Sequence, residues 1–291
     1  MEMVHFIPPS QRRLAMLAAQ ADTAPALISG ASGSGKGVIV RWIHENSSRA
    51  AHPLVTAVHD KPLSEQIPLA QGGTFVIPEI GECTLTEQKD LLHFLRTKSV
   101  KIHLDGDLPM LLNVRIIATT SQALDARAQG GLFNTELLEK LNVFRIEMPS
   151  LSKRVGEFED IVTGVLGEIT RELHKEHLRT LSPEALKRLS NYEWPGNIRE
   201  LRNVLRLSVL AAKGEKIEVL DLPQFGHDQI DFRATREQFE RIYIQELLRA
   251  FNFEVDRACR VTRIDKKILL SKMKQYGIAQ GNPSQTEPFL H

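Results

Sequence analysis

The sequence has little cysteine and no long apolar run. Its 291 residues include two cysteines, Cys83 and Cys259, with no CxxC pair and no Cys/His cluster. This composition excludes a disulfide framework, indicates no metal site and is typical of the reducing cytoplasm. No apolar stretch reaches the ~20 residues of a transmembrane helix, so we expect no membrane partner. Pro8-Pro9 and Arg12-Arg13 stand where a signal peptide needs its apolar core, which argues against export.

An excess of charge of either sign is also lacking. Lys and Arg number 37 and Asp and Glu number 36, a net charge of +1. The chain as a whole therefore gives no indication of nucleic-acid binding, and any basic surface must be local. The hydrophobic content of 42% is sufficient for globular cores, and the length permits one large domain or several smaller ones.

Glycine is concentrated in one segment near the start of the chain, Gly30-Ala31-Ser32-Gly33-Ser34-Gly35-Lys36. The segment follows the apolar Ala26-Leu27-Ile28 and precedes an expected helix, which is the context of a phosphate-binding loop. Glycines let backbone N–H groups converge on phosphate oxygens, and the helix adds the positive end of its dipole. We expect ATP or ADP to be held by Gly30, Gly33, Ser34, Gly35, Lys36 and Gly37. The alternative is a flexible Gly/Ser loop with a solvated lysine.

Short apolar strands alternate with helices over the first half of the chain. The alternation predicts an α/β fold with a mostly parallel sheet and helices on both faces. From about Ser152 to Lys213 the pattern becomes helical, with a capping signal at Ser182-Pro183-Glu184. The expected strands are Ala26–Ser29, Leu54–Val58, Thr74–Ile77, Val114–Thr119 and Val143–Ile146, and the expected helices are Gly37–Glu45, Thr86–Thr97, Ala123–Gln129 and Thr135–Leu141.

The C-terminal segment is locally basic. Between Val255 and Ile278 there are seven Lys and Arg residues and two Asp residues, a net charge of +5. Apolar residues recur there with helix-turn-helix spacing, which predicts helices Val255–Val261 and Asp265–Tyr276, the second entering the major groove of double-stranded DNA. The expected DNA-binding residues are Arg263, Lys266, Lys267, Ser271, Lys272 and Lys274. The alternative is a solvated basic helix pair used for oligomerisation.

A long helix, Arg233–Asn252, is expected before this pair. Single helix-turn-helix units bind DNA as dimers, so we expect a homodimer or higher oligomer. The expected pairing face consists of Phe239, Ile242, Ile244, Leu247 and Leu248.

Several ordered segments resemble a known family. They read GASGSGKG, GGTFVIPEIGE, NVRIIATTS, LNVFRIEMPSL and WPGNIRELRN, followed by a closing KQYGI. On these segments, and over residues 8–278, the chain is similar to the bacterial enhancer-binding proteins, the sigma-54-dependent transcription activators. The resemblance implies an AAA+ P-loop parallel sheet (1–150), a helical lid subdomain (151–213) and an all-α Fis-type helix-turn-helix domain (232–279). The polar, Pro-containing stretch 214–231 is expected to be a linker, and residues 280–291 are expected to form a disordered tail.

The resemblance also assigns roles to three further residues. Thr120 and Ser121 stand where the family senses the γ-phosphate, although Ser121 replaces an asparagine. Arg199 matches the lid arginine that reports the nucleotide state. The alternative for Arg199 is an ion pair with Glu200 or Glu193. Trp194-Pro195-Gly196 is expected to fix a helix start.

The chain departs from the family at the end of its third expected strand. The family has Asp-Glu after this apolar run, whereas here Pro78-Glu79 follows. The aspartate normally holds the magnesium shell, and proline has no carboxylate. Gly37 supplies no hydroxyl for the metal either, so magnesium binding is doubtful. Glu79 remains as a residual catalytic group that is expected to be ineffective. The alternative is that Pro78 only ends the strand.

A second departure lies in the segment that carries arginine fingers in the family. Such fingers stabilise charge as the phosphate transfers. Here the two positions read Asn134 and Lys140, and neither offers the planar fork of arginine. Val58 stands near the position of a family asparagine that restrains the catalytic glutamate. ATP hydrolysis is therefore expected to be lost or strongly impaired.

A third departure is a deletion. Family activators insert a helical hairpin tipped by GAFTGA before this strand, and the hairpin engages sigma-54. Here only Asp60–Gln71 is available, and GAFTGA is not found in the chain. Sigma-54 remodelling by that route is therefore not expected.

These observations favour a DNA-binding transcriptional regulator with a degenerate, nucleotide-binding AAA+ core. One alternative is an interaction protein that joins or inhibits rings of an intact AAA+ relative. Another is a slow residual ATPase. RNA polymerase is a further expected partner. No receiver domain precedes the phosphate loop, so control is expected from nucleotide, a partner protein or expression level.

Overall fold

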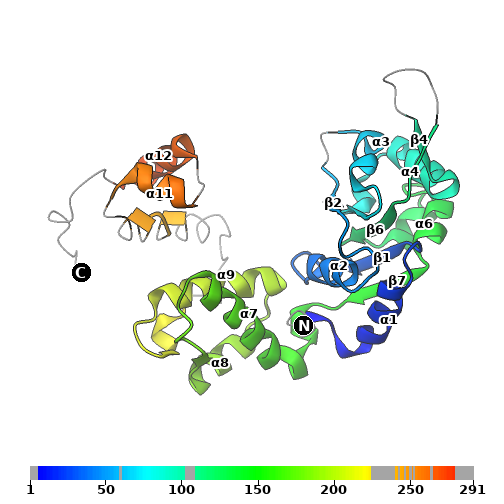
Figure 1. Ribbon diagram of the computed structural model, residues 1–291. Helices are drawn as coiled ribbons and strands as arrows, with labels where there is room; N and C mark the ends of the chain where they lie inside the picture. Colours follow the sequence, from blue (N-terminus) through cyan, green and yellow to red (C-terminus); the bar gives the residue numbers. More distant parts are fainter. Residues whose placement is uncertain are drawn as a thin grey trace. The chain divides into compact units, whose positions relative to one another are not determined.

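The computed structural model divides into two compact units, Met1–Pro223 and Gln224–His291 (Figure 1). It describes residues 6–58, 61–101 and 109–223 of the first unit and 240–241, 243–245, 247–248, 251, 253–262 and 265–278 of the second. Among the described residues, no helix is long and apolar enough to cross a membrane.

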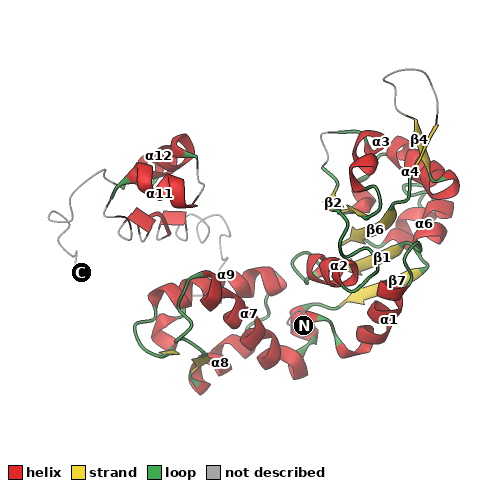
Figure 2. Cartoon of the chain, viewed as in Figure 1, coloured by secondary structure: helices red, strands yellow, loops and turns green. Residues whose placement is uncertain are grey.

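The first unit is built on a parallel sheet of five strands in the order β2-β3-β6-β1-β7 (Figure 2). All of its strand pairs are parallel, and β1 lies between β6 and β7, with Leu27 opposite Ala118 and Ile28 opposite Ile146. The strands are β1 (Ala26–Gly30), β2 (Leu54–Thr56), β3 (Thr74–Ile77), β6 (Arg115–Thr120) and β7 (Phe144–Met148). The predicted α/β fold with a parallel sheet is confirmed.

Alternate residues of the strands enter two cores, one on each face of the sheet. Ile28 and Val76 pack with alanines and β-branched residues of α1 (Pro9–Gln20) and α2 (Lys36–Glu45). Leu27 and Phe75 pack on the other face. This alternation follows from the period of two in a strand. The helices of that second face include α4 (Leu85–Thr97) and α6 (Thr135–Leu141), and α5 (Leu124–Gln129) contributes Leu124.

Arg49 joins the beginnings of three strands. Its guanidinium donates to the Asp22 carbonyl before β1, to the Gly72 and Gly73 carbonyls before β3, and to Asn113 before β6, at distances between 2.6 and 3.2 Å. A buried arginine is tolerated here because each of its three nitrogens donates to at least one of these acceptors. The amino ends of the strands are therefore fixed together, on the edge opposite the phosphate loop.

The segment between β2 and β3 is short and packed. It forms α3 (Leu63–Gln66) and the 3₁₀ turn η2 (Ile67–Ala70). Leu63, Ile67 and Ala70 are buried in the core. Further along the chain, η3 (Ile80–Glu82) follows β3, and the hairpin of β4 (Ser99–Lys101) and β5 (Pro109–Leu111) follows α4.

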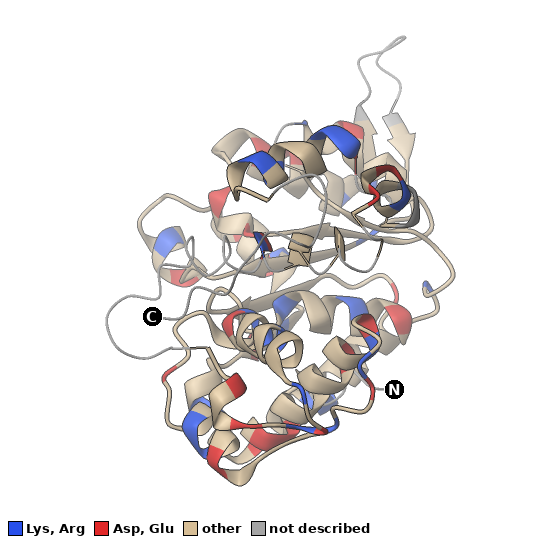
Figure 3. Ribbon diagram, turned by 90° about the vertical axis from the view of Figure 1, so that its left-hand side faces the viewer, with Lys and Arg blue, Asp and Glu red and all other residues tan. Residues whose placement is uncertain are grey.

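A helical lid completes the first unit. Helices α7 (Phe158–Glu172) and α9 (Asn197–Ala211) pack together and are joined by ion pairs of Arg202 with Glu168 and of Arg206 with Glu172. Over the chain as a whole, Figure 3 shows Lys and Arg in blue interspersed with Asp and Glu in red. The smaller lid elements are η4 (Leu151–Lys153), η5 (Val155–Glu157), β8 (Thr180–Leu181), α8 (Pro183–Ser190), β9 (Lys216–Ile217) and η6 (Val219–Asp221).

The lid extends further along the chain than predicted, past residue 214 where the linker was expected to begin. Residues 216–217 pair with β8, Ile217 is fully buried, and Leu222 is 6% exposed. This segment therefore belongs to the lid as far as Pro223. The mostly polar composition of this segment gave no indication that Ile217 and Leu222 are buried in the lid. The remaining linker residues and the tail lie outside the described residues.

The second unit contains α11 (Val255–Thr262) and α12 (Lys266–Gln275), joined by residues 263–265. Described residues of the preceding segment, including Ile244, Leu247 and Leu248, are helical and buried against Ala258, Leu269 and Met273 of these two helices. Ile244, Leu247 and Leu248 therefore belong to the core of this unit and do not supply the expected pairing face. Phe239 and Ile242 lie outside the described residues.

Candidate functional site

The glycine-rich loop connects the carboxyl end of β1 to the start of α2. Gly33 and Gly35 have φ of +75° and +99°, a region that side chains other than glycine rarely adopt. A Cβ at Gly33 would lie 2.2 Å from the carbonyl oxygen of Gly196 in the lid. The loop therefore needs glycine both for its turn and for its contact with the lid.

Lys36 folds back over its own loop. Its Nζ donates to the carbonyls of Gly30 at 2.7 Å and Ala31 at 3.2 Å, and it lies 3.1 Å from Oε1 of Glu79. Lys36 is 8% exposed. An ammonium has three donors, and these three acceptors match them. A phosphate must therefore displace at least one of them.

Glu79 is held in the left-handed region, with φ of +44°, directly after β3. Its Oε2 accepts hydrogen bonds from the Ser121 amide at 2.6 Å and hydroxyl at 2.8 Å. Burial acts to raise the pKa of Glu79, but the Ser121 hydrogen bonds and the Lys36 ammonium outweigh it and hold the pKa below its usual value of 4.5. The group is therefore a fixed carboxylate near neutral pH.

The lid contacts the phosphate loop through the start of α9. Asn197, with φ of +55°, donates from Nδ2 to the Ser32 carbonyl at 3.0 Å and accepts at Oδ1 from the Leu151 amide at 2.8 Å. The Arg199 amide donates to the Gly33 carbonyl at 3.3 Å, and its Nη1 donates to the Ser32 hydroxyl, also at 3.3 Å. The lid thus holds the loop mainly through backbone carbonyls.

Glu200 has partners other than Arg199. Its carboxylate accepts from the Tyr192 hydroxyl at 3.0 Å and from the Gly196 amide at 2.8 Å. Trp194 is buried and donates from Nε1 to the Leu189 carbonyl at 2.9 Å. Both residues fix the turn that precedes α9.

A cleft with a volume of about 940 Å³ lies beside the loop. Of the expected nucleotide residues, Gly33, Gly35, Lys36, Gly37 and Arg199 line it, together with Pro78 and Glu79. The structure brings Thr119 to the cleft in place of the expected Thr120. Thr120 is 1% exposed, and its hydroxyl is bonded within the turn to Gln122. Neighbouring strand residues face opposite sides of the sheet, which separates Thr119 from Thr120.

The residues present fit a nucleotide better than a magnesium ion. The glycine loop, its lysine and the adjacent cleft form a cradle for phosphates, and the buried Ser34 hydroxyl has no hydrogen-bond partner among the described residues. At Gly37 no atom lies within 4 Å of an added Cβ, so the space for a metal-binding hydroxyl is present but the hydroxyl is not. Pro78 offers no oxygen ligand from its side chain. The carboxylate beside the loop is that of Glu79, which is held by Ser121 and Lys36.

The two positions that the resemblance assigns to arginine fingers, Asn134 and Lys140, lie at the two ends of α6. Asn134 is the N-cap of α6, and its Oδ1 accepts from the Leu137 amide at 2.9 Å. Lys140 is exposed in the last turn of the same helix. Val58 is half exposed, and its backbone is bonded on both sides by the Gln66 side chain.

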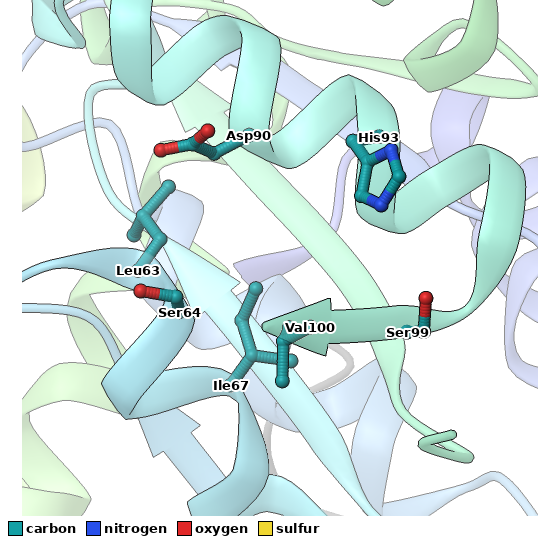
Figure 4. A pocket seen from close by; sticks show the side chains of 7 residues that line it. All are labelled: Leu63, Ser64, Ile67, Asp90, His93, Ser99 and Val100. Carbon is teal, nitrogen blue, oxygen red and sulfur yellow. The ribbon is translucent and has the colours of Figure 1, made fainter. Parts of the chain in front are cut away.

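A second cavity of about 300 Å³ lies between α3, α4 and β4 (Figure 4). It shares no lining residue with the cleft at the phosphate loop. Leu63, Ile67 and Val100 form a buried apolar floor, and Asp90 and His93 stand at its exposed rim on α4. None of the residues that the sequence analysis selected lies in this cavity.

The expected DNA-binding residues of α12 divide into two groups. Lys266 is paired with Asp256 at 2.6 Å, and Lys272 is paired with Glu240, which also accepts from the Tyr276 hydroxyl. The other expected DNA-binding residues on this helix are exposed, namely Lys267, Ser271 and Lys274. Arg263 lies outside the described residues.

The sheet order, the loop after β1 and the helical lid define an AAA+ P-loop NTPase fold. Residues 9–151 match the family model described as a sigma-54 interaction domain, and residues 152–238 match the AAA+ ATPase lid domain. The chain belongs to this sigma-54 interaction domain family of AAA+ proteins.

Individual relatives and solved structures agree with this family. The chain is 30% identical to the alginate biosynthesis transcriptional regulatory protein AlgB of Pseudomonas syringae pv. tomato, over 87% of this chain and 62% of that protein. It is 33% identical to the DNA-binding transcriptional regulator NtrC of Salmonella typhimurium, over 68% and 46%. The structure of Brucella abortus NtrX in complex with ATP is similar in fold, with a TM-score of 0.65 and 24% identity over 92% of this chain and 67% of that one. The chain spans about three-fifths of the length of the AlgB relative.

Sequence reasoning missed Asn197 as the residue that joins lid and loop. The signal was present, because asparagine directly after Trp-Pro-Gly is one of the few residues that tolerate positive φ. It also missed the pairing of Lys36 with Glu79. Their separation of 43 positions gives no sequence signal for the pair.

We predict that alanine at Gly33 and at Gly37 changes stability in opposite directions. Gly33→Ala should destabilise the chain by ~1–3 kcal/mol, because it combines positive φ with a clash against the lid backbone. Gly37→Ala should stabilise it by up to ~1 kcal/mol, because the site is helical and open. Urea unfolding of both variants measures the two free energies. Equal stability of Gly33→Ala and the wild type would show that the lid contact is not close.

Proposed function

We propose that this chain is a nucleotide-binding transcription regulator that binds double-stranded DNA and has strongly impaired ATP hydrolysis. The observation that carries the proposal is a phosphate loop with complete geometry beside Pro78 and Gly37, which supply no side-chain oxygen to a metal. Such a site retains the groups that bind phosphate and lacks the groups that support its transfer.

Nucleotide binding rests on the loop and on Lys36. The cleft has room for a nucleotide, and Brucella abortus NtrX, which shares the fold, was solved with ATP and with ADP. When a nucleotide is bound, its phosphates would lie against the loop amides and Lys36. Glu79 would then be released from Lys36 and stay bonded to Ser121.

Impaired hydrolysis follows from the missing side chains. Glu79 is the carboxylate placed to orient a water, but with no carboxylate at position 78 and no hydroxyl at position 37 the transferring phosphate loses its metal support. Asn134 and Lys140 do not replace an arginine fork at a neighbouring subunit. A slow residual turnover through Glu79 remains the alternative.

The proposal that the chain regulates transcription without remodelling sigma-54 rests on the segment before β3. In the structure residues 61–71 are folded as α3 and η2, with Leu63 and Ile67 in the core, and they form no protruding hairpin. The relatives include AlgB and NtrC, which are named transcriptional regulators. We therefore propose regulation by DNA binding, as a repressor or together with RNA polymerase.

DNA binding is assigned to the second unit, with α12 as the helix that enters the major groove. Lys267 and Lys274 are exposed on this helix and have no ion-pair partner in the part of the chain that the structure describes. A homodimer or higher oligomer would present two such helices to a two-fold site. Should DNA binding be absent, joining the rings of an intact AAA+ relative becomes the leading function.

The first prediction from this proposal concerns nucleotide affinity. Lys36→Ala should abolish the thermal stabilisation of the chain by ADP, because the phosphates lose their cation. Glu79→Gln should tighten ADP binding about fivefold, since it removes a carboxylate that competes for Lys36 at a cost of ~1 kcal/mol. Thermal shift titrations with ADP measure both. A wild-type chain that is not stabilised at millimolar ADP would refute nucleotide binding.

The second prediction concerns turnover. Steady-state ATP hydrolysis should lie far below about one per second, a common enzyme rate. Pro78→Asp alone, or with Gly37→Thr, should not restore an ordinary rate, because the finger positions are unchanged. A coupled ATPase assay tests this. Turnover near one per second that disappears in Glu79→Ala would contradict the proposal.

The third prediction concerns salt dependence on DNA. Affinity for a duplex selected with the full chain should fall linearly with the logarithm of salt concentration. Lys267→Ala should reduce the slope by about one, as for one lost phosphate contact. The matched control Lys266→Ala should reduce it less, because Lys266 is already paired with Asp256. Fluorescence anisotropy over a salt series gives the slopes, and identical slopes for all three proteins would contradict the assignment.

A further inference from the structure

One helix face in the second unit carries an apolar side chain that its own core does not use. Ile268 is 58% exposed, whereas its neighbour Leu269 is 1% exposed and Met273 is 2% exposed. Both of these neighbours pack in the core with Leu248 and Ala258. Ile268 is therefore exposed by the rotation of the helix and not by a gap in the packing.

The surroundings of Ile268 on this face are polar and basic. Ser271 follows it by three positions and Gln275 by seven, which places all three on one side of α12. Lys267 and Lys274 are seven positions apart, about two turns of the helix, and adjoin this side. All five of these residues are exposed. Every residue of α12 is described, and none of them is acidic.

The paired lysines of α12 lie off this face. Lys266 is bonded to Asp256 of α11, and Lys272 to Glu240 of the preceding helical segment. No ion pair is recorded for Lys267 or Lys274 among the described residues. The outward face thus combines two available cations with one apolar side chain, and a polyanion with an apolar group in reach would complement it.

From this face we infer that Ile268 determines specificity by packing against the C5-methyl group of a thymine in the major groove. The inference rests on the proposed DNA binding and adds the base that is read. Thymine is the base that presents an apolar group at the major-groove edge, and an isoleucine can offer only apolar contact. Lys267 and Lys274 hold the flanking phosphates, which fixes the helix in the groove.

A second copy of the chain is the other candidate to cover Ile268. Pairing two such faces would bring Lys267 and Lys274 of both copies together without an acidic partner from α12, and like charges in contact are unfavourable. Duplex DNA buries the isoleucine and neutralises both lysines at once.

The test replaces single thymines by uracil, which removes the methyl group and leaves base pairing intact. The full chain first selects its tightest duplex from a random-sequence library, and every thymine of that duplex is then replaced in turn. At the contacted position the wild type should lose about fourfold in affinity, the value of one buried methyl group. Ile268→Ala should bind the thymine and uracil duplexes equally.

Lys267→Ala is the matched control. It should weaken binding to both duplexes by the same factor and retain the fourfold difference, because a phosphate contact does not sense the methyl group. Thermal midpoints of both variants should equal that of the wild type, since both side chains are exposed.

Four results would overturn the inference. If no thymine is sensitive to replacement, or if Ile268→Ala retains the uracil effect, DNA binding stands but Ile268 is not the reader. If the chain selects no duplex at all, the proposed DNA binding fails and the inference fails with it. A change of oligomeric state in Ile268→Ala, with no effect of uracil, would assign the face to self-association.

Discussion

The close contact between the backbones of Gly33 and Gly196 constrains the whole first unit. It leaves no room for a side chain at Gly33, and Asn197 extends it by binding the Ser32 carbonyl on one side and the Leu151 amide on the other. The phosphate loop, the end of the sheet and the start of α9 are therefore one mechanical element. Any ligand that moves Ser32 or Gly33 must also move the lid.

Phosphate binding and hydrolysis depend on different groups at this site. Binding phosphate requires backbone amides, positive φ at glycines and one cation, and Gly33, Gly35 and Lys36 satisfy these requirements. Hydrolysis requires oxygen ligands at fixed side-chain positions, and Gly37 and Pro78 do not provide them. The first set depends on the fold of the loop, whereas the second depends on single residues. A chain can lose the second set with little effect on the first.

The sheet was predictable because its strands are short apolar runs between polar breaks, and the predicted strands at Ala26, Thr74 and Val143 each agree with the structure to within a few residues. Helix α1 was missed because its buried positions, Ala15, Ala18 and Ala19, are alanines, which give a weak periodic signal. Composition likewise could not show that Ile217 completes the lid.

At the site, the sequence predicted residue types better than their facing or pairing. Whether Thr119 or Thr120 reaches the cleft depends on the phase of one strand. Whether Lys266 or Lys267 is available depends on the position of Asp256, which lies on another helix. Such facts arise from tertiary packing, which a pattern within one segment does not contain.

The N-cap at Asn134 has a consequence for substitutions at this position. Its side chain closes the first turn of α6, and an N-cap of this type contributes about 1 kcal/mol that arginine would not supply. An arginine at this position would therefore lower stability at the start of α6, whatever its effect on turnover. The side chain at position 134 is thus under a structural constraint that is independent of the chemistry at the cleft.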